Sequence, residues 1–190
     1  MNNRINIIKE EILSDNWYTL KKITFNYLTK KQEWQTLSRE AYDRGNGATI
    51  LLYNKQHKTV ILTRQFRLPT FINGNDTGML IEACAGLLDK DSPEEAIRRE
   101  TGEETGYIIS SVEKVYEAYM SPGSVTEKLY FFIAEYTTDM KTHTGGGVDD
   151  EEIEVMELPF EEAMAQVQNG QIADGKTIML LQHLALSGIM

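Results

Sequence analysis

Three glutamates, Glu100, Glu103 and Glu104, lie within the segment RRETGEETG at residues 98–106. On a helix with 3.6 residues per turn each side chain is rotated by about 100° from the one before, so the three carboxylates share an arc of about 100°. Ala96 and Ile97 extend the same arc. On a solvated amphipathic helix the acids would lie opposite the apolar residues, so this helix predicts acids that face the protein interior.

Carboxylates at this spacing repel one another by roughly a few tenths of a kcal/mol per pair in water, and by more when they are partly buried. Mg²⁺ and Mn²⁺ prefer oxygen ligands and leave coordination positions for water and phosphate oxygens. The acidic stripe is therefore a candidate site for a hard divalent cation. From the helix alone, the alternative is a charged surface helix whose acids pair with arginines.

The boundaries of this helix follow from local signals. Ser92 is a candidate N-cap, Pro93 occupies the first helical position, and Glu95 stands three residues after the cap. This is the pattern of a capping box. Gly106 supplies the stop signal. Gly102 lies inside the helix, where glycine costs about 1 kcal/mol relative to alanine, and this indicates close packing at that position.

The rest of the chain predicts a mixed α+β fold. Three β-rich segments within residues 4–42 predict a small antiparallel sheet, and residues 48–66 predict a hairpin. After the loop at 72–78, the segment MLIEACAG at 79–86 predicts one strand. Beyond the helix, the sequence predicts, in order, strands at 111–120 and 128–136, a glycine-rich acidic loop at 144–152, a strand at 153–159, and helices at 160–169 and 176–187.

Composition narrows the class of protein. The chain has 190 residues, 41% of them hydrophobic and 25% charged, and a formal net charge of −10. Such a charge disfavours nonspecific binding to nucleic acid or to an anionic membrane. The single cysteine, Cys84, excludes an internal disulfide. The N-terminal segment MNNRINIIKEE lacks the apolar core of a signal peptide, and no apolar run reaches the length of a membrane span. We therefore expect a cytoplasmic protein with neither nucleic-acid nor membrane partners.

Residues 86–107, GLLDKDSPEEAIRRETGEETGY, resemble the Nudix box G-x5-E-x7-R-E-U-x-E-E-x-G-U, where U is a bulky apolar residue. The matching residues are Arg99, Glu100, Glu103, Glu104, Gly106 and Tyr107. The first half departs from the pattern, because the box is one residue short from Gly86 and Ser92 stands where glutamate is expected. Asp91 is the acid at the family spacing before Arg99, and Thr101 replaces the usual aliphatic residue. The missing glutamate is the box acid least tied to metal, so its loss affects the orientation of loop and helix more than catalysis.

The resemblance extends over nearly the whole chain, through segments such as TRQFRLP, LIEACAGLLD, GGGVDDEEIEV and DGKTIMLLQHL. The chain resembles the ADP-ribose and GDP-mannose pyrophosphatase branch of the Nudix hydrolases, and most closely the bacterial GDP-mannose pyrophosphatases. This implies a Nudix α/β/α sandwich with a mixed sheet over residues 45–190. It also implies that residues 1–44 form an antiparallel β domain, which is exchanged across a homodimer and contributes to the partner's active site.

The resemblance also implies the residues of a metal site. The ligands would be Glu100, Glu104, Glu151 and the backbone carbonyl of Ala85, with Mg²⁺ or Mn²⁺ as the cofactor. Glu103 would be a further ligand, directly or through water, which makes four catalytic glutamates. Arg99 would orient the box glutamates. The rivals of Glu151 as the loop acid and base are Asp149, Asp150 and Glu152.

Substrate contacts are implied at eleven positions. They are Trp17, Arg39, Glu40, Arg67, Ala85, Gly86, Glu104, Glu127, Asp150, Glu151 and Lys176. Trp17 would stack on a guanine, or else belong to the dimer core or an exposed apolar surface. Arg67 and Lys176 could instead be solvated surface residues, and the loop at 145–152 could be an ordinary flexible acidic turn.

The implied reaction is Mg²⁺-dependent hydrolysis of the pyrophosphate bond of a nucleoside diphosphate sugar, with GDP-mannose giving GMP and mannose 1-phosphate. The alternatives are an ADP-ribose pyrophosphatase and a Nudix module that senses a nucleotide sugar without cleaving it. Loss of the box glutamates would mark such a module, and here they are retained. The segment GNGAT at 45–49 has neither Walker nor Rossmann spacing, so a kinase or dehydrogenase has no support.

Overall fold

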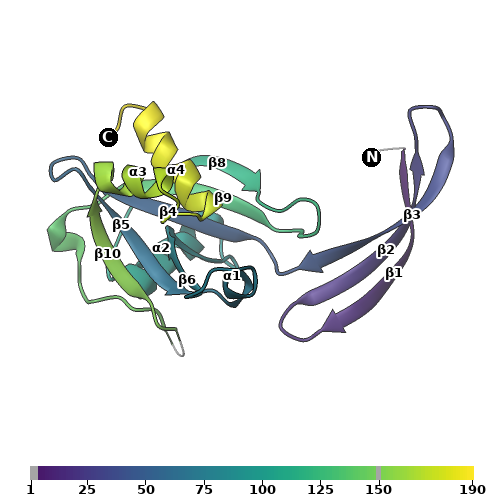
Figure 1. The fold of residues 1–190 in the computed structure, drawn as a ribbon, viewed down its shortest axis with the longest axis horizontal. Helices are drawn as coiled ribbons and strands as arrows, with labels where there is room; N and C mark the ends of the chain where they lie inside the picture. Colours follow the sequence, from purple (N-terminus) through teal and green to yellow (C-terminus); the bar gives the residue numbers. More distant parts are fainter. Residues whose placement is uncertain (1–3, 149–150) are drawn as a thin grey trace. The chain divides into compact units, whose positions relative to one another are not determined.

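The computed structural model describes residues 4–148 and 151–190. Its residues fall into two compact units. The first combines the chain up to Asn46 with Ser121–Lys128, and the second comprises Gly47–Met120 and Leu129–Met190. Figure 1 follows the chain through both units. Within the described residues, no helix is long and apolar enough to cross a membrane.

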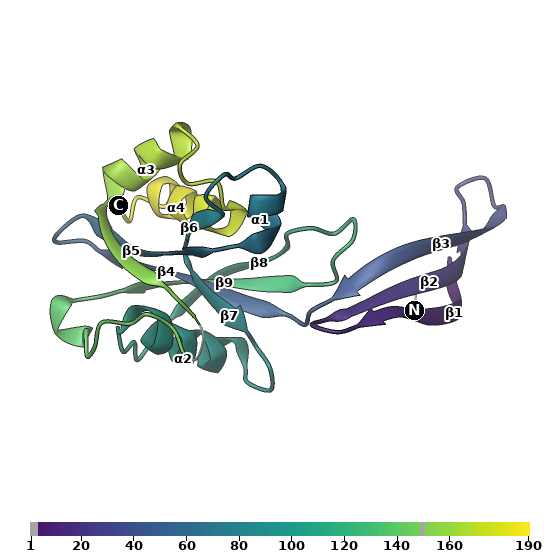
Figure 2. The same cartoon turned by 60° about the horizontal axis from the view of Figure 1, so that its bottom comes forward.

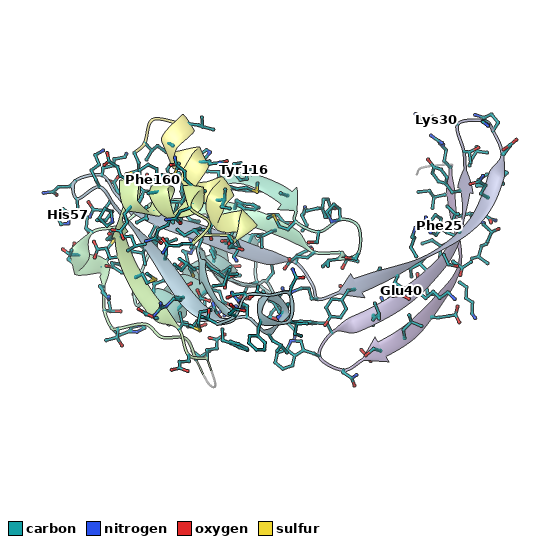
Figure 3. All side chains as sticks on the ribbon, in the orientation of Figure 1. Phe25, Lys30, Glu40, His57, Tyr116 and Phe160 are labelled. Atoms are coloured by element: carbon teal, nitrogen blue, oxygen red, sulfur yellow. The ribbon has the colours of Figure 1, made fainter. Side chains whose placement is uncertain are left out.

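The first unit is a three-stranded antiparallel sheet of β1 (Ile5–Asp15), β2 (Thr19–Leu28) and β3 (Trp34–Asp43). Ile7, Phe25 and Leu37 are in register across the strands, and Figure 3 labels Phe25 on β2. Side chains alternate between the faces of a sheet, so this row lies on one face. Hydroxyl and amide side chains lie on the other, where Thr24 and Ser38 share a hydrogen bond of 3.0 Å. Along this row the sheet therefore has an apolar face and a polar face.

The second unit contains a seven-stranded mixed sheet. Its strands are β4 (Gly47–Asn54), β5 (Thr59–Phe66), β6 (Met79–Glu82), β7 (Cys84–Leu87), β8 (Glu113–Tyr119), β9 (Lys128–Glu135) and β10 (Glu154–Pro159). Its helices are α1 (Leu68–Ile72), α2 (Pro93–Thr105), α3 (Phe160–Gln168) and α4 (Gly175–Leu186), with a 3₁₀ turn η1 (Thr138–Met140). β4 is buried along its whole length, and it pairs in parallel with β9 and antiparallel with β5 and β7.

Helices cover both faces of this sheet. Figure 2 shows α2 on one side and α3 and α4 on the other. Phe131 and Ile133 of β9 belong to the core that also holds Leu180 of α4. Phe132 of β9 belongs to the core that also holds Ile97 of α2. Successive side chains of β9 thus belong to two cores, one on each face of the sheet. The expected α/β/α sandwich with a mixed sheet is confirmed.

One strand prediction is wrong in detail. Residues 79–86 were expected to form a single strand, but the segment divides at Ala83 into β6, which pairs with β5, and β7, which pairs with β4. The reason is that β4 and β5 pair directly only between residues 52–54 and 59–61. Beyond that point each strand takes its own partner. The Ala83 N–H instead donates to Thr177 Oγ1 of α4 at 2.6 Å. The short α1 and η1 were also not predicted, since so few residues show no periodicity.

Candidate active site

Helix α2 begins and ends where its local signals predict. The Ser92 side chain accepts a hydrogen bond from the Glu95 N–H at 3.3 Å, and Glu95 Oε2 accepts one from the Ser92 N–H at 3.1 Å. Gly106 ends the helix in the left-handed region with φ of 78°. Ala96 and Ile97 are fully buried, and Glu104 on the same side is only 3% exposed. The acidic and apolar stripes of α2 therefore coincide, as expected.

Two glycines allow close approach to α2. A Cβ at Gly86 of β7 would lie 2.1 Å from Glu100 Cδ, so this carboxyl group occupies space that any other residue would fill. Gly102, inside α2, is buried. The chain beyond the helix returns there, and Ile108 Cδ1 would lie 3.3 Å from an added Cβ. The close packing inferred at Gly102 is present.

Arg99 holds the acids of the box together. Its Nη1 donates to Glu100 Oε1 at 2.9 Å and to Glu103 Oε2 at 3.3 Å. Its Nε donates to Asp91 Oδ2 at 3.4 Å. All of these partners belong to the box itself, so this geometry supports the interpretation of Arg99 as a residue that orients the glutamates.

Glu104 is the most perturbed carboxyl group of the site. Burial raises its pKa from 4.5 to about 7; the Cys84 thiol and Arg67 oppose the rise, and the charges of Glu100 and Glu151 add to it. Burial also raises the pKa of Glu100, which Arg99 lowers in part. Among the described residues, Glu104 Oε2 has no hydrogen-bond partner. A buried oxygen without a partner is costly, and it identifies the position where a ligand is expected.

The triple-glycine loop docks on the end of α2. The Gly146 N–H donates to the Glu104 carbonyl at 2.9 Å, and the Gly147 N–H donates to the Glu103 carbonyl at 3.2 Å. These bonds satisfy helix carbonyls that have no partner within α2. A Cβ at Gly145 would lie 2.3 Å from the Glu104 carbonyl oxygen, so the loop needs glycine to approach this closely.

Docking of this loop brings Glu151 to the acids of α2. Its charge raises the pKa of both Glu100 and Glu104, which reports its proximity. Glu151 Oε2 accepts a hydrogen bond from the Val148 N–H at 3.1 Å. Asp150, predicted as a substrate contact, and Asp149, a rival for the base, lie outside the described residues.

The residues of this site fit a hard divalent cation. No three His, Cys, Asp or Glu side chains of the described residues already form a closed metal cage. The donors are nevertheless carboxylate oxygens, as Mg²⁺ and Mn²⁺ require. Glu104 Oε2 lacks a partner, and the absence of a side chain at Gly86 leaves room for the Glu100 carboxyl group. Glu103 and Glu104 lie in the last turn of α2, which has no basic residue. The C-terminal end of a helix favours positive charge, so a bound cation would be favoured there.

Arg67 and Lys176 meet at a third residue that the sequence analysis missed. Glu82 is 4% exposed, and its Oε2 accepts a hydrogen bond from Arg67 Nε at 2.6 Å. Its Oε1 forms an ion pair with Lys176 Nζ, which also lies 3.0 Å from Asp174 Oδ1. The reading of Lys176 as a solvated lysine is wrong, because its side chain is 12% exposed.

Of the remaining predicted contacts, Ala85 lies next to Gly86 on β7, and the other four belong to the first unit. Trp17 is 84% exposed in the β1–β2 turn. Arg39 and Glu40, the latter labelled in Figure 3, follow one another on β3. Since successive side chains of a strand alternate, they lie on opposite faces of that sheet. Glu127 forms an ion pair of 3.5 Å with Arg44.

The sequence and fold are similar to those of known proteins. A model described as the GDP-mannose pyrophosphatase NudK N-terminal domain matches residues 4–42. The GDP-mannose pyrophosphatase of Pectobacterium atrosepticum is 58% identical over 188 residues, which cover 99% of this chain and 97% of the relative. That of Escherichia coli K12 is 55% identical over 190 residues, the full length of both chains.

A crystal structure of an ADP compounds hydrolase superposes with a TM-score of 0.72, covering 99% of this chain and 98% of that one. The identity is 17%, so this likeness concerns the fold alone. The NUDIX domain model matches residues 43–181, which include the sandwich, the acids of α2 and the glycine loop. The chain therefore belongs to the Nudix hydrolase family.

Proposed function

We propose that this protein hydrolyses the pyrophosphate bond of a nucleoside diphosphate sugar with Mg²⁺ or Mn²⁺, and that GDP-mannose is its substrate, giving GMP and mannose 1-phosphate. The observation that carries the chemistry is the buried, unpartnered Glu104 oxygen on a helix that matches the Nudix box. The substrate is supported by full-length relatives named GDP-mannose pyrophosphatase, at 55% and 58% identity.

The acids of α2 have separate roles in this proposal. Glu100, Glu104, Glu151 and the Ala85 carbonyl would hold the metal, with Glu103 as a further ligand. When bound, a divalent cation neutralises diphosphate charge and lowers the pKa of a coordinated water. Arg99 keeps the Glu100 and Glu103 carboxylates in place through its hydrogen bonds. Glu151, on the loop docked to α2, would take the proton of the attacking water.

The remaining residues would bind the substrate. Arg67 and Lys176 would contact the diphosphate, together with Ala85, Gly86, Glu104, Asp150 and Glu151. Trp17 would stack on the guanine, and the other contacts from the first unit would be Arg39, Glu40 and Glu127. The exposure of Trp17 leaves its ring free to stack on a base.

A substrate panel tests this proposal. GDP-mannose, GDP-glucose and ADP-ribose are incubated with the protein and Mg²⁺, and products are separated by ion-exchange chromatography. We expect GMP and mannose 1-phosphate from GDP-mannose, and no products when EDTA replaces Mg²⁺. Glu104→Gln tests the proposed metal ligand. We expect its turnover to fall by orders of magnitude while its circular dichroism spectrum is retained. Near-normal turnover in this variant would refute the metal-ligand assignment.

A second candidate substrate is ADP-ribose, which the same panel tests. The solved structure with the same fold is titled as an ADP compounds hydrolase. If ADP-ribose has the highest kcat/KM, the choice of GDP-mannose is wrong while the chemistry stands. If GDP-mannose binds without being cleaved, the chain is a sensing module.

We also propose a homodimer in which residues 1–44 are exchanged and residues 45–190 form the hydrolase domain. Large apolar side chains are exposed on the first unit, and among them Ile5, Ile7 and Ile12 lie on the face of Phe25 and Leu37. An apolar surface of this kind marks an interface. We expect a dimeric mass by light scattering at micromolar concentration. Ile7→Glu on the apolar face should give monomers, whereas Thr36→Glu on the polar face should not; a monomeric wild type contradicts the exchange.

The cytoplasm is the proposed location. The only cysteine, Cys84, is free and buried, so the fold requires no oxidising compartment. The net charge of −10 opposes nonspecific binding to nucleic acid and anionic membranes. Cell fractionation tests this location, and recovery in the membrane or periplasmic fraction would contradict it.

A further inference from the structure

Glu82 is a buried acid without a role in the chemistry described so far. It is the last residue of β6, at the point where the chain leaves β5 and continues along β4. Its side chain is 5% exposed, and each carboxylate oxygen pairs with a different cation. These cations come from distant parts of the sequence, with Arg67 after β5 and Lys176 in the first turn of α4. Glu82 thus joins three elements at one point.

Both cations retain hydrogen-bond donors after pairing with Glu82. Arg67 uses Nε for this contact, and among the described residues its two terminal amino groups have no hydrogen-bond partner. Lys176 Nζ carries three hydrogens and has two acidic partners, Glu82 and Asp174. The chain continues from Glu82 into β7, where the Glu100 carboxyl group of α2 occupies the space beside Gly86. Glu82, with its two cations, therefore lies on the strand segment that runs to the acids of α2.

We propose that Glu82 is a positioning residue for diphosphate hydrolysis, which holds Arg67 and Lys176 from the buried side so that their remaining donors face the diphosphate of the substrate. This inference rests on the proposed function. Fixing a guanidinium through Nε leaves its terminal amino groups oriented, and a donor oriented in advance loses less entropy when a phosphate binds.

The competing explanation is a purely structural link between β6 and α4. The two roles differ in what they predict for catalysis. A structural link affects the thermal midpoint and leaves the kinetic constants of the folded protein unchanged. A positioning residue affects kcat/KM through the cation that it holds, and this effect shrinks once that cation is removed.

The experiment uses steady-state hydrolysis of GDP-mannose with Mg²⁺ by the full-length protein, at a temperature well below every thermal midpoint. Glu82→Gln removes the charge and keeps the shape. Thr177→Val is the structural control, since Thr177 also links this strand break to α4 through the Ala83 N–H. Both substitutions are also made in an Arg67→Ala background.

We expect Glu82→Gln to lower kcat/KM at least about tenfold, which corresponds to the loss of a charge-assisted hydrogen bond. Thr177→Val should lower the thermal midpoint while kcat/KM stays within about twofold of wild type, since it changes none of the charged side chains. It removes the Thr177 Oγ1 hydrogen bond to Asp174, but the Thr177 N–H still donates to that carboxylate at 3.0 Å. In the Arg67→Ala background, the further loss caused by Glu82→Gln should shrink to less than about threefold.

Three results would overturn the role of Glu82: wild-type kcat/KM in Glu82→Gln, an equal kinetic loss in Thr177→Val, or an undiminished loss in the Arg67→Ala background. Should Glu82→Gln not fold, Glu82→Asp keeps the charge but is too short to bridge both cations, and wild-type kcat/KM in that variant would also overturn it. Absence of GDP-mannose hydrolysis by the wild type contradicts the proposed function instead, so the two failures are distinguishable.

Discussion

Glu104→Gln should stabilise the metal-free protein at the same time as it removes activity. The Glu104 carboxyl is 3% exposed, and burial raises its pKa to about 7. Above that pH the metal-free protein must hold a charge in a site with little water. A glutamine has nearly the same shape and carries no charge. The substitution therefore removes a destabilising group from the fold and a proposed ligand from the metal site.

The magnitude follows from the difference between the folded and unfolded pKa. The folded value of about 7 exceeds 4.5, and each pKa unit corresponds to about 1.4 kcal/mol. Because the pKa of Glu104 is higher in the folded state, binding of a proton by this side chain stabilises the fold. This contribution to the free energy of unfolding is fully present below about pH 4.5 and is lost as pH rises through about 7. At pH 8 the Glu104 carboxylate should cost the metal-free fold about 3 kcal/mol relative to its protonated form.

The assay is urea unfolding in EDTA at pH 5 and pH 8, followed by circular dichroism. We expect Glu104→Gln to be more stable than wild type at pH 8, with the difference shrinking at pH 5. Glu103→Gln is the control, since its side chain is 33% exposed and pairs with Arg99; it should not be stabilised. Mg²⁺ should stabilise wild type and not Glu104→Gln, because only a ligand that binds the folded state shifts unfolding. If Glu104→Gln is less stable than wild type at pH 8, the Glu104 carboxylate does not destabilise the metal-free protein, and this reasoning is refuted.

Two further substitutions test the geometry of the site. Gly86→Ala should displace the Glu100 carboxylate and lower kcat by about a hundredfold, since misplacement by about 1 Å can cost that much; Gly123→Ala, where an added Cβ meets nothing within 4 Å, should be neutral. Equal kcat in the two alanine variants would contradict the close approach. Glu151→Gln should lower kcat much more than Glu152→Gln, measured across pH 6 to 9 with Mg²⁺, and the reverse order would transfer the role of base to Glu152.

The catalytic helix could be predicted from sequence because its determinants are local. The Ser92 and Glu95 capping box and the Gly106 stop lie within the helix or next to it. The rotation per residue then places Glu104 on the side of Ile97. Both residues are buried in the structure. A helix whose ends and faces are set by neighbours in sequence needs no knowledge of the rest of the fold.

Glu82 could not be predicted, because its environment is set by distant residues. In the run MLIEACAG it looks like one polar residue of a half-buried strand. Its partners lie 15 and 94 positions away in the sequence. They meet only because β4 and β5 separate and residues 79–87 fill the space between them. The only sequence signal was an acid inside an apolar segment, which is rare without a partner.

The glycine loop combines a predictable part with an unpredictable one. Glycines followed by acids indicated either a metal-site loop or a flexible acidic turn. In the structure the amides of Gly146 and Gly147 bond the last carbonyls of α2, so the loop is docked on the helix. Those bonds tie Glu151 to the same helix end as Glu103 and Glu104. This docking depends on backbone groups, which a sequence pattern of side chains does not report.

The negative charge of the site predicts that a nucleotide diphosphate binds only weakly without a divalent cation. The basic residues are already paired, Arg99 with acids of the box and Arg67 and Lys176 with Glu82. Glu104 and Glu151 add negative charge beside them. A diphosphate would therefore meet a net repulsive field in a chain whose net charge is −10.

Calorimetry with GDP at constant ionic strength measures this dependence directly. With Mg²⁺ we expect binding at least about tenfold tighter than in EDTA, because the cation reverses the local field for the diphosphate. In Glu104→Gln the advantage of Mg²⁺ should largely disappear. Equal affinity in EDTA and Mg²⁺ would show that the paired cations alone bind the diphosphate, and the acids of α2 would then need another explanation for their burial.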